Sequence, residues 1–246
     1  MVSEDTVILV DVGNTRIKAQ RLSQLGGEPA VFDDWPALHS YLQRLSASHI
    51  YFASVRQQSV SDEFIAWCAS HNMKCREIIT EREAFGITNS YQNVGKMGVD
   101  RWLAMLGAAE LASNTFCVID TGTATTVDFV SNGKHLGGWI VPGYQTMKSA
   151  LVSATKRVTA DASVPDTLDV GNDTEACVSQ GCHAAVIGVY LSAVDYLSRK
   201  QTPFDVILSG GDKKLFANVE LGGSIRSANL VVHGLARYAR RELYAS

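Results

Sequence analysis

Two short loops of similar sequence carry residue types that suit phosphate binding. One reads Asp11-Val12-Gly13-Asn14-Thr15, and the other, a domain's length further along the chain, reads Asp120-Thr121-Gly122-Thr123-Ala124. Backbone amides beside a glycine, together with small hydroxyl or amide side chains, can cradle phosphate oxygens. A neighbouring carboxylate can hold Mg²⁺ through water, because Mg²⁺ takes few protein carboxylates and keeps much of its hydration. Two such loops facing each other would grip the polyphosphate of a nucleotide.

Lys18, just beyond the first loop, adds a positive charge that could reach a phosphate. Arg16 and Lys18 are two positions apart and therefore share one face of a strand. The sequence has neither the Gly-x-x-x-x-Gly-Lys-Ser/Thr motif nor the Gly-x-Gly-x-x-Gly motif of other nucleotide sites. An isolated Asp-x-Gly is more often a plain turn, so the functional interpretation depends on the repetition and on Lys18.

Gly98-Val99-Asp100-Arg101 stands at the start of an expected helix. The simplest interpretation of Asp100 is a helix N-cap. A carboxylate at a helix start is also kept ionised by the helix dipole. It could accept the proton of an attacking hydroxyl in phosphoryl transfer, where positioning matters more than basicity. Arg101 could bind a substrate carboxylate through two parallel hydrogen bonds.

Two glycine-rich stretches are weaker indications of a binding site. Residues 137–143 could form a substrate wall or a tightly packed bend in a strand. Ser209-Gly210-Gly211-Asp212 follows a short expected strand, and it could admit a nucleoside close to the backbone or be a plain turn.

The elements that must position these residues alternate between strands and helices, which predicts an α/β fold. Apolar or β-branched runs predict strands over 6–12, 16–22, 50–55, 75–79, 116–120, 125–130, 134–141 and 205–208. Helical periodicity predicts helices over 35–47, 60–70, 100–112, 144–157, 183–199 and 230–244, with a loop over 158–173. Because each Asp-x-Gly loop ends one apolar strand and precedes another, we expect two similar lobes, 1–115 and 116–246.

Composition narrows the class of protein. The 246 residues include 22 Lys and Arg against 25 Asp and Glu, a net charge of −3 that offers no basic surface for nucleic acid. The sequence lacks a run of 18 apolar residues, so we expect no membrane span. Its acidic start, Glu4-Asp5, is unlike a secretory signal. The five cysteines form no Cys-x-x-Cys pair, so we expect reduced thiols, no zinc site and a cytoplasmic protein.

Together these motifs resemble those of the type III pantothenate kinases, in the acetate and sugar kinase/Hsp70/actin superfamily, across essentially the whole chain. The first phosphate motif (11–18), Gly98-Val99-Asp100-Arg101 and the second phosphate motif (120–123) are specific as an ordered set, although each alone is common. The resemblance implies two actin-like, ribonuclease H-like lobes related by duplication, with an ATP cleft between them. It also implies ATP-dependent phosphorylation of pantothenate to 4′-phosphopantothenate, the first step of coenzyme A synthesis, by a homodimer.

The resemblance also implies roles for individual residues. It makes Asp100 the proton acceptor, Asp120 a ligand for K⁺ or NH₄⁺, and Asp11 the residue that organises Mg²⁺. Thr174 would contact pantothenate across the dimer interface. The implied ATP and phosphate contacts are Asp11, Val12, Gly13, Asn14, Thr15, Arg16, Ile17, Lys18, Gly122, Thr123, Ser209, Gly210 and Gly211. The implied pantothenate contacts are Tyr91, Gly98, Val99, Asp100, Arg101 and Thr174.

Two positions depart from the usual pattern of the family. Val94 stands where members often have proline, which would fix φ in the loop after Tyr91. Ser209 stands where they often have threonine, and it keeps the hydroxyl. Neither change removes a reacting group. Two other interpretations stay open: an actin-fold phosphohydrolase acting on a nucleotide or polyphosphate, and a non-catalytic ATP-gated interaction module, against which the short chain argues.

Overall fold

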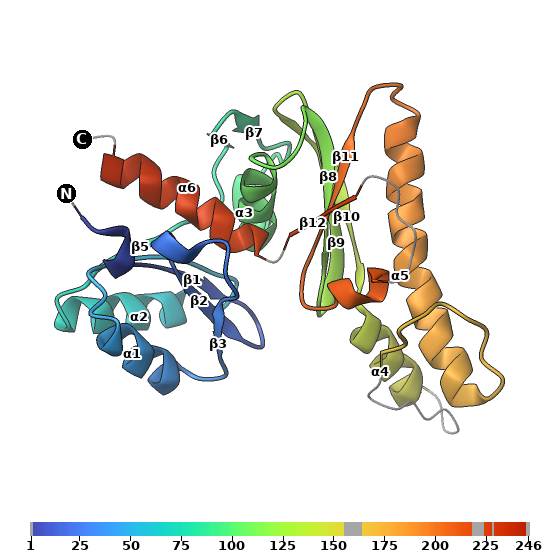
Figure 1. Cartoon of the computed structure of the whole chain (residues 1–246), viewed down its shortest axis with the longest axis horizontal. Coiled ribbons are helices and arrows are strands. Elements are labelled where there is room, and N and C mark those ends of the chain that lie inside the picture. The colour runs from blue at the N-terminus through green and yellow to red at the C-terminus, as the bar shows by residue number, and fades with distance from the viewer. Residues whose placement is uncertain (1, 155–163, 218–223, 228, 245–246) are drawn as a thin grey trace. The chain divides into compact units, whose positions relative to one another are not determined.

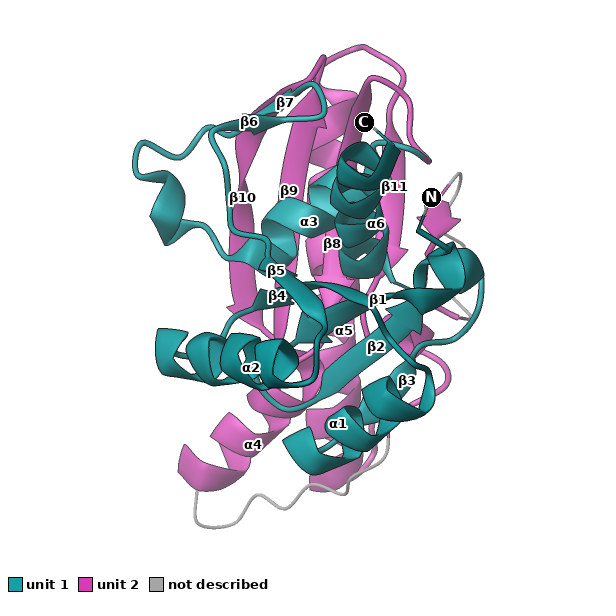
Figure 2. Ribbon diagram, turned by 90° about the vertical axis from the view of Figure 1, so that its left-hand side faces the viewer, with its two compact units in different colours: residues 1–110, 229–246 teal, residues 111–228 magenta. Residues whose placement is uncertain are grey.

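The computed structural model describes residues 2–154, 164–217, 224–227 and 229–244. The chain forms two compact units, shown in different colours in Figure 2. Unit 1 comprises residues 1–110 and 229–246, and unit 2 comprises residues 111–228. The C-terminal helix α6 (Leu230–Tyr244) therefore belongs to unit 1, whereas the division expected at residue 115 placed it in the second lobe.

Unit 1 is built on a five-stranded mixed sheet (Figure 1). Its strands are β1 (Val7–Val12), β2 (Ile17–Arg21), β3 (Ala30–Phe32), β4 (His49–Ser54) and β5 (Lys74–Glu77). The strand order is β3-β2-β1-β4-β5. The first three strands pair antiparallel, and β4 and β5 add parallel to β1. The strands expected over 6–12, 16–22, 50–55 and 75–79 are confirmed, and β3 was not expected.

Helices cover this sheet with apolar side chains. They are α1 (Trp35–Arg44), α2 (Gln58–Ser70), α3 (Val99–Ala108) and α6. Helix α1 starts where Asp34 accepts a hydrogen bond from the Ala37 amide at 2.9 Å, as expected of an N-cap. Leu38 of α1 and Phe64 of α2 share a buried cluster with Ile8 and Val10 of β1. A short hairpin, β6 (Glu83–Ala84) and β7 (Ile87–Thr88), also belongs to this unit.

Unit 2 repeats the same strand arrangement. Its strands are β8 (Thr115–Thr121), β9 (Ala124–Ser131), β10 (Lys134–Pro142), β11 (Asp205–Ser209) and β12 (Ser224–Arg226). Strands β8, β9 and β10 pair antiparallel in sequence order, and β11 and β12 add parallel to β8. This matches the order and directions of β1 to β5, so the repeated loops lie in repeated folds.

Two helices accompany the second sheet. Helix α4 (Tyr144–Ala154) falls within the range expected over 144–157, although residues 155–163 lie outside the described residues. Helix α5 (Thr174–Ser198) starts nine residues before the expected 183, because Asp173 caps it by accepting a hydrogen bond from the Ala176 amide at 2.7 Å. Within the described residues, α5 is the one helix whose length and mean hydropathy, 1.4, would suit a membrane span. Its buried residues, including Val186 and Leu197, belong to the core of unit 2, as in the core helix of a globular protein.

Helices α3 and α6 pack with their backbones unusually close. A Cβ built on Gly107 would lie 2.3 Å from the Leu230 carbonyl oxygen, and one built on Gly234 would lie 2.3 Å from the Leu103 carbonyl oxygen. Each helix therefore presents a glycine where the other passes, so α6 can pack closely in unit 1.

Gly234→Ala should lower the free energy of unfolding by about 1–3 kcal/mol, because the added methyl group has no room against α3. Urea unfolding followed by circular dichroism measures this. Gly26→Ala is the matched control in the same unit, because a Cβ there meets no atom within 4 Å. Equal stability of the two variants would contradict the close packing of α3 and α6.

Candidate active site

The first phosphate loop connects β1 to β2 in unit 1. The Gly13 amide donates to the Arg16 carbonyl at 3.0 Å, which closes the turn. Asp11 on β1 and Lys18 on β2 are direct partners in the antiparallel register. Direct partners present their side chains on the same face of a sheet. The structure therefore puts the carboxylate and the ammonium group expected from the sequence on one face beside the loop.

Arg56 supports this loop and was not expected. It follows β4, whose parallel pairing with β1 continues as the Val55 amide donates to the Val12 carbonyl at 3.1 Å. The Arg56 Nε atom donates to the Gly13 carbonyl at 2.8 Å. A strand followed by arginine is a weak sequence signal, since only the register with β1 brings Arg56 to the loop.

The second phosphate loop has its own supports in unit 2. The Gly122 amide donates to the Ala124 carbonyl at 3.0 Å and closes the turn between β8 and β9. The Thr123 carbonyl accepts hydrogen bonds from the Gly143 amide at 3.0 Å and from the Thr146 hydroxyl at 2.6 Å. A Cβ on Gly143 would lie 1.8 Å from the Gly122 carbonyl oxygen. The end of the glycine-rich stretch 137–143 therefore packs directly on this loop.

The Ser209-Gly210-Gly211 turn lies against the same loop. Asp120 on β8 is the parallel partner of Ser209 on β11. The Thr121 hydroxyl donates to the Ser209 carbonyl at 3.2 Å, and the Asp212 amide donates to the Thr121 carbonyl at 3.1 Å. Gly210 has φ +98°, and a Cβ there would lie 2.1 Å from the Thr121 oxygen, so both conformation and space require glycine.

Asp100 lies in the first turn of α3, but it is not the N-cap. The helix begins at Val99 with Gly98 as its N-cap residue, and the Asp100 Oδ1 atom accepts a hydrogen bond from the Arg101 amide at 2.8 Å. A Cβ on Gly98 would come within 2.5 Å of that oxygen. The N-cap interpretation is therefore wrong, and the glycine leaves space for the Asp100 carboxylate.

The structure brings Tyr91 and Arg101 together in unit 1. The Arg101 side chain is buried, with the residue 7% exposed, and its NH1 group donates to the Tyr91 hydroxyl at 2.9 Å. The guanidinium carbon also lies 5.8 Å from the centre of the Tyr91 ring. Val94 begins a short 3-10 turn, Val94–Lys96, which Asn93 caps by accepting from the Gly95 amide at 3.1 Å.

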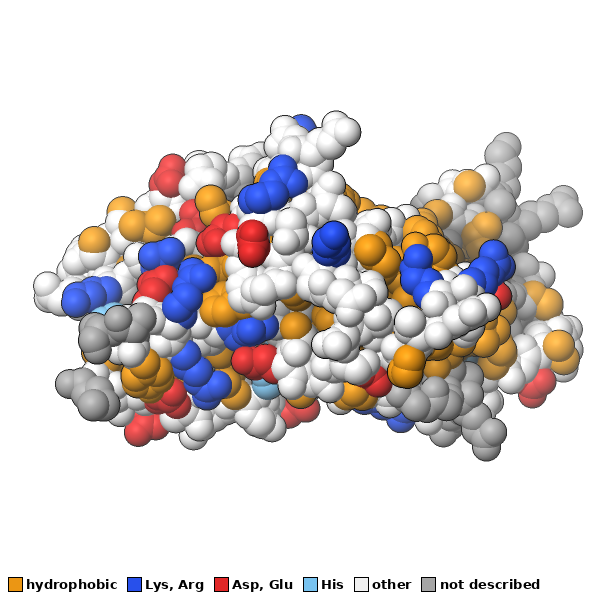
Figure 3. Space-filling model, turned by 90° about the horizontal axis from the view of Figure 1, so that it is seen from above, with side chains coloured by type: hydrophobic (Ala, Val, Ile, Leu, Met, Phe, Trp, Pro, Cys, Tyr) orange, Lys and Arg blue, Asp and Glu red, His pale blue; other side chains and the backbone are white. Residues whose placement is uncertain are grey.

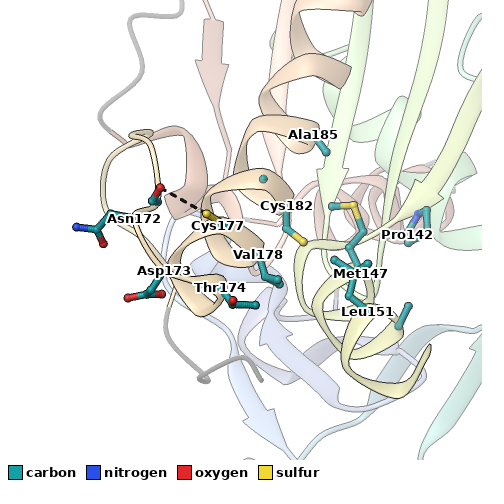
Figure 4. Close-up of a pocket in the computed structure, with 13 residues that line it drawn as sticks. Pro142, Met147, Leu151, Asn172, Asp173, Thr174, Cys177, Val178, Cys182 and Ala185 are labelled. Atoms are coloured by element: carbon teal, nitrogen blue, oxygen red, sulfur yellow. Dashed lines mark hydrogen bonds between the residues drawn. The ribbon is translucent and has the colours of Figure 1, made fainter. Parts of the chain in front are cut away.

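Thr174 lies in a different environment, an apolar pocket of about 940 Å³ between α4 and α5 in unit 2. In Figure 4, Met147 and Leu151 of α4 face Val178 and Cys182 of α5 across this pocket. The described lining residues include Thr174, expected as a substrate contact, and Pro142, from the glycine-rich stretch 137–143. Thr174 is exposed at the start of α5 in unit 2, whereas the other expected substrate residues belong to unit 1.

The carboxylates fit a metal that is bound largely through phosphate and water. The described residues contain no group of three or more His, Cys, Asp and Glu side chains that could hold a metal ion. Asp11 and Asp120 each offer one carboxylate near the end of a central strand. A lone carboxylate such as that of Asp11 suits Mg²⁺ that a nucleotide carries. Burial raises the pKa of the nearby Asp212 carboxyl, and Lys214 partly opposes this effect.

Charges of both signs occur on the face of the molecule that Figure 3 shows. On the face that Figure 3 shows, basic and acidic side chains are interspersed, in line with the net charge of −3. The two positive charges that the sequence predicts for an anionic substrate are single residues, Lys18 on β2 and Arg101 on α3.

Two solved structures share the fold of this chain. A Campylobacter jejuni protein assigned to the Baf family of transcriptional activators aligns with TM-score 0.62 and 20% identity, over 97% of this chain and 100% of its own. A Sinorhizobium meliloti protein assigned as a 2-dehydro-3-deoxygalactonokinase aligns with TM-score 0.56 and 13% identity, over 98% and 100% of the two chains. At these identities the likeness establishes the fold, an α/β fold of two actin-like lobes.

Sequence comparison identifies the family. The type III pantothenate kinase of Pseudoalteromonas atlantica is 30% identical over 97% of this chain and 99% of its own length. That of Pseudoalteromonas translucida is 33% identical over 93% and 94% of the two chains. A family model described as type III pantothenate kinase matches residues 7–195. The chain therefore belongs to the type III pantothenate kinase family.

Proposed function

We propose that this chain transfers the γ-phosphoryl group of ATP to the 4′-hydroxyl of pantothenate, in the first step of coenzyme A biosynthesis, in the cytoplasm. Family membership supports the reaction. The observation that carries it to the site is the pairing of Tyr91 with buried Arg101, directly beside Asp100 at the start of α3. A cation and a carboxylate at one helix start suit a substrate that has a carboxylate at one end and a hydroxyl to be phosphorylated.

Asp100 accepts the proton of the attacking hydroxyl. Its place in the first turn of α3 puts it near the positive end of the helix dipole, which favours the ionised carboxylate. Phosphoryl transfer has a loose transition state, so the carboxylate needs accurate positioning more than strong basicity. The hydrogen bond from the Arg101 amide and the space left by Gly98 support that positioning.

Arg101 binds the carboxylate of pantothenate, and Tyr91 holds the guanidinium in place. A buried guanidinium presents a fixed fork of donors that matches a carboxylate. The Tyr91 hydroxyl occupies one donor at 2.9 Å and its ring lies near the cation, which limits the directions that the remaining donors take.

The two loops bind the phosphates of ATP, one from each unit. Their backbone amides and small side chains, with Lys18, supply hydrogen bonds and charge. Asp11 holds the Mg²⁺ of the nucleotide through water, and Asp120 is a ligand for K⁺ or NH₄⁺. Bound cations supply charge neutralisation, while the residues of the chain hold the loops in place through the contacts of Arg56, Gly143 and Gly210.

The enzyme acts as a homodimer whose interface includes the outer face of α5. Between Glu175 and Asp195 the sequence contains no Asp, Glu, Lys or Arg. The outer residues are small or apolar, and Leu191 is 57% exposed. An uncharged helix face of this length suits burial against a partner. Thr174, at the start of α5, then contacts pantothenate bound by the other subunit.

Asp100→Asn should lower kcat by about 10²–10⁴-fold, because the amide cannot accept the hydroxyl proton. Formation of 4′-phosphopantothenate from ATP, Mg²⁺, K⁺ and pantothenate measures it, and ATP binding should persist. Asp62→Asn, on the exposed side of α2, is the matched control. A loss within about tenfold would contradict the role of Asp100. ATP consumption that does not depend on pantothenate would instead favour a phosphohydrolase.

Leu191→Arg should convert the dimer into a monomer, because a charge would be buried in the interface. Light scattering coupled to gel filtration measures the mass. Ser198→Arg, at the exposed end of the same helix, is the matched control and should stay dimeric. An unchanged dimer in Leu191→Arg would move the interface away from α5.

Mixing Asp100→Asn with Thr174→Ala chains should restore activity that neither variant shows alone. In a two-fold dimer each site would take Asp100 from one chain and Thr174 from the other, so a hybrid dimer contains one intact site. After mixing under dissociating conditions, about a quarter of wild-type activity is expected for random pairing. No recovery would show that both residues act within one chain.

A further inference from the structure

We propose that Arg82 is a positioning residue for pantothenate, which holds residues 89–92 so that Tyr91 is aligned on Arg101. This inference rests on the proposed roles of Tyr91 and Arg101. The Arg82 NH1 group donates to the Asn89 carbonyl at 3.0 Å and to the Tyr91 carbonyl at 2.7 Å. Its NH2 group donates to the Gln92 carbonyl at 2.8 Å. One guanidinium thus binds three carbonyls of a four-residue segment.

Asn89 holds the same segment from inside. This side chain is buried, and its Oδ1 atom accepts a hydrogen bond from the Tyr91 amide at 2.9 Å. The backbone N–H group of Asn89 donates to the Arg82 carbonyl at 2.8 Å. The Tyr91 backbone is therefore held at both its N–H group and its carbonyl, and the anchors are Asn89 and Arg82.

The end of the segment that follows Tyr91 is bound to Thr80, two residues before Arg82. The Thr80 hydroxyl donates to the Met97 carbonyl at 3.0 Å, one residue before Gly98. Residues 80–82 therefore form a polar support along the segment that carries Tyr91 and leads to Asp100. Val94 lacks the fixed φ of a proline, and these hydrogen bonds restrain residues 89–97 instead of a fixed dihedral angle at position 94.

We expect the hydrogen bonds of Arg82 to affect the position of Tyr91 more than the stability of the fold. Arg82 and Gln92 are exposed, and Tyr91 is half-buried, so the segment adds little apolar surface to the core of unit 1. The Tyr91 hydroxyl, by contrast, must lie 2.9 Å from Arg101 to direct that guanidinium. A small displacement of the segment is enough to misalign a substrate-binding group.

Arg82→Lys is the decisive variant, because lysine keeps the charge but lacks the fork of donors that binds three carbonyls. We expect the KM for pantothenate to rise about tenfold, with the KM for ATP and the thermal midpoint nearly unchanged. Arg76→Lys is the matched control, since Arg76 pairs with Glu242 in the same unit, away from the loop. Unchanged pantothenate KM in Arg82→Lys, or an equal rise in both KM values, would overturn the proposal.

A double-mutant cycle separates positioning from a general structural role. If Arg82 acts through the Tyr91 hydroxyl, Arg82→Lys should change the pantothenate KM little further in a Tyr91→Phe background. Fully additive effects would overturn the inference while leaving the proposed site intact. If Tyr91→Phe alone leaves the pantothenate KM unchanged, the proposed role of Tyr91 fails and the inference about Arg82 fails with it.

Discussion

The central strand of each unit pairs antiparallel on one side and parallel on the other, and the rest of each candidate site depends on this arrangement. Strand β1 lies between β2 and β4, and β8 lies between β9 and β11. The antiparallel neighbour forces a tight turn directly after the central strand, and that turn is the proposed phosphate loop. The parallel neighbour ends at the same edge of the sheet, so the residues that follow it come to lie beside the loop.

The two units use that second neighbour in different ways. After β4, Arg56 reaches the Gly13 carbonyl with a charged donor at 2.8 Å. After β11, Gly210 brings its backbone so close to Thr121 that no side chain fits. Arg56 places a positive charge beside the loop of unit 1, whereas the turn at Gly210 packs its backbone against the loop of unit 2. The duplicated fold therefore supports its two Asp-x-Gly loops through different local contacts.

The sequence predicts most of the central strands, the two Asp-x-Gly turns and α6, because each depends on local pattern. It predicts neither Arg56 nor Arg82, because their roles depend on register between strands and on carbonyls that no side-chain pattern reveals. The N-cap interpretation of Asp100 failed by two positions, since Gly98 caps α3 and Val99 starts it. The early start of α5 was missed because glycine and small polar residues at 174–182 weaken the helical pattern, whereas the Asp173 cap determines where the helix begins.

Helix α5 is apolar both on the side that faces the core of unit 2 and on its exposed side. Its apolar character extends around the helix, so its length and mean hydropathy would also suit a membrane span. One side contributes Val186, Tyr190 and Leu197 to the core of unit 2. A helix that is apolar on all sides is stable in water only when its other side is covered too. In the proposed homodimer, a second copy of the chain would cover that side and, by the same contact, bring Thr174 to the partner's substrate, so one helix would carry both the interface and the contact.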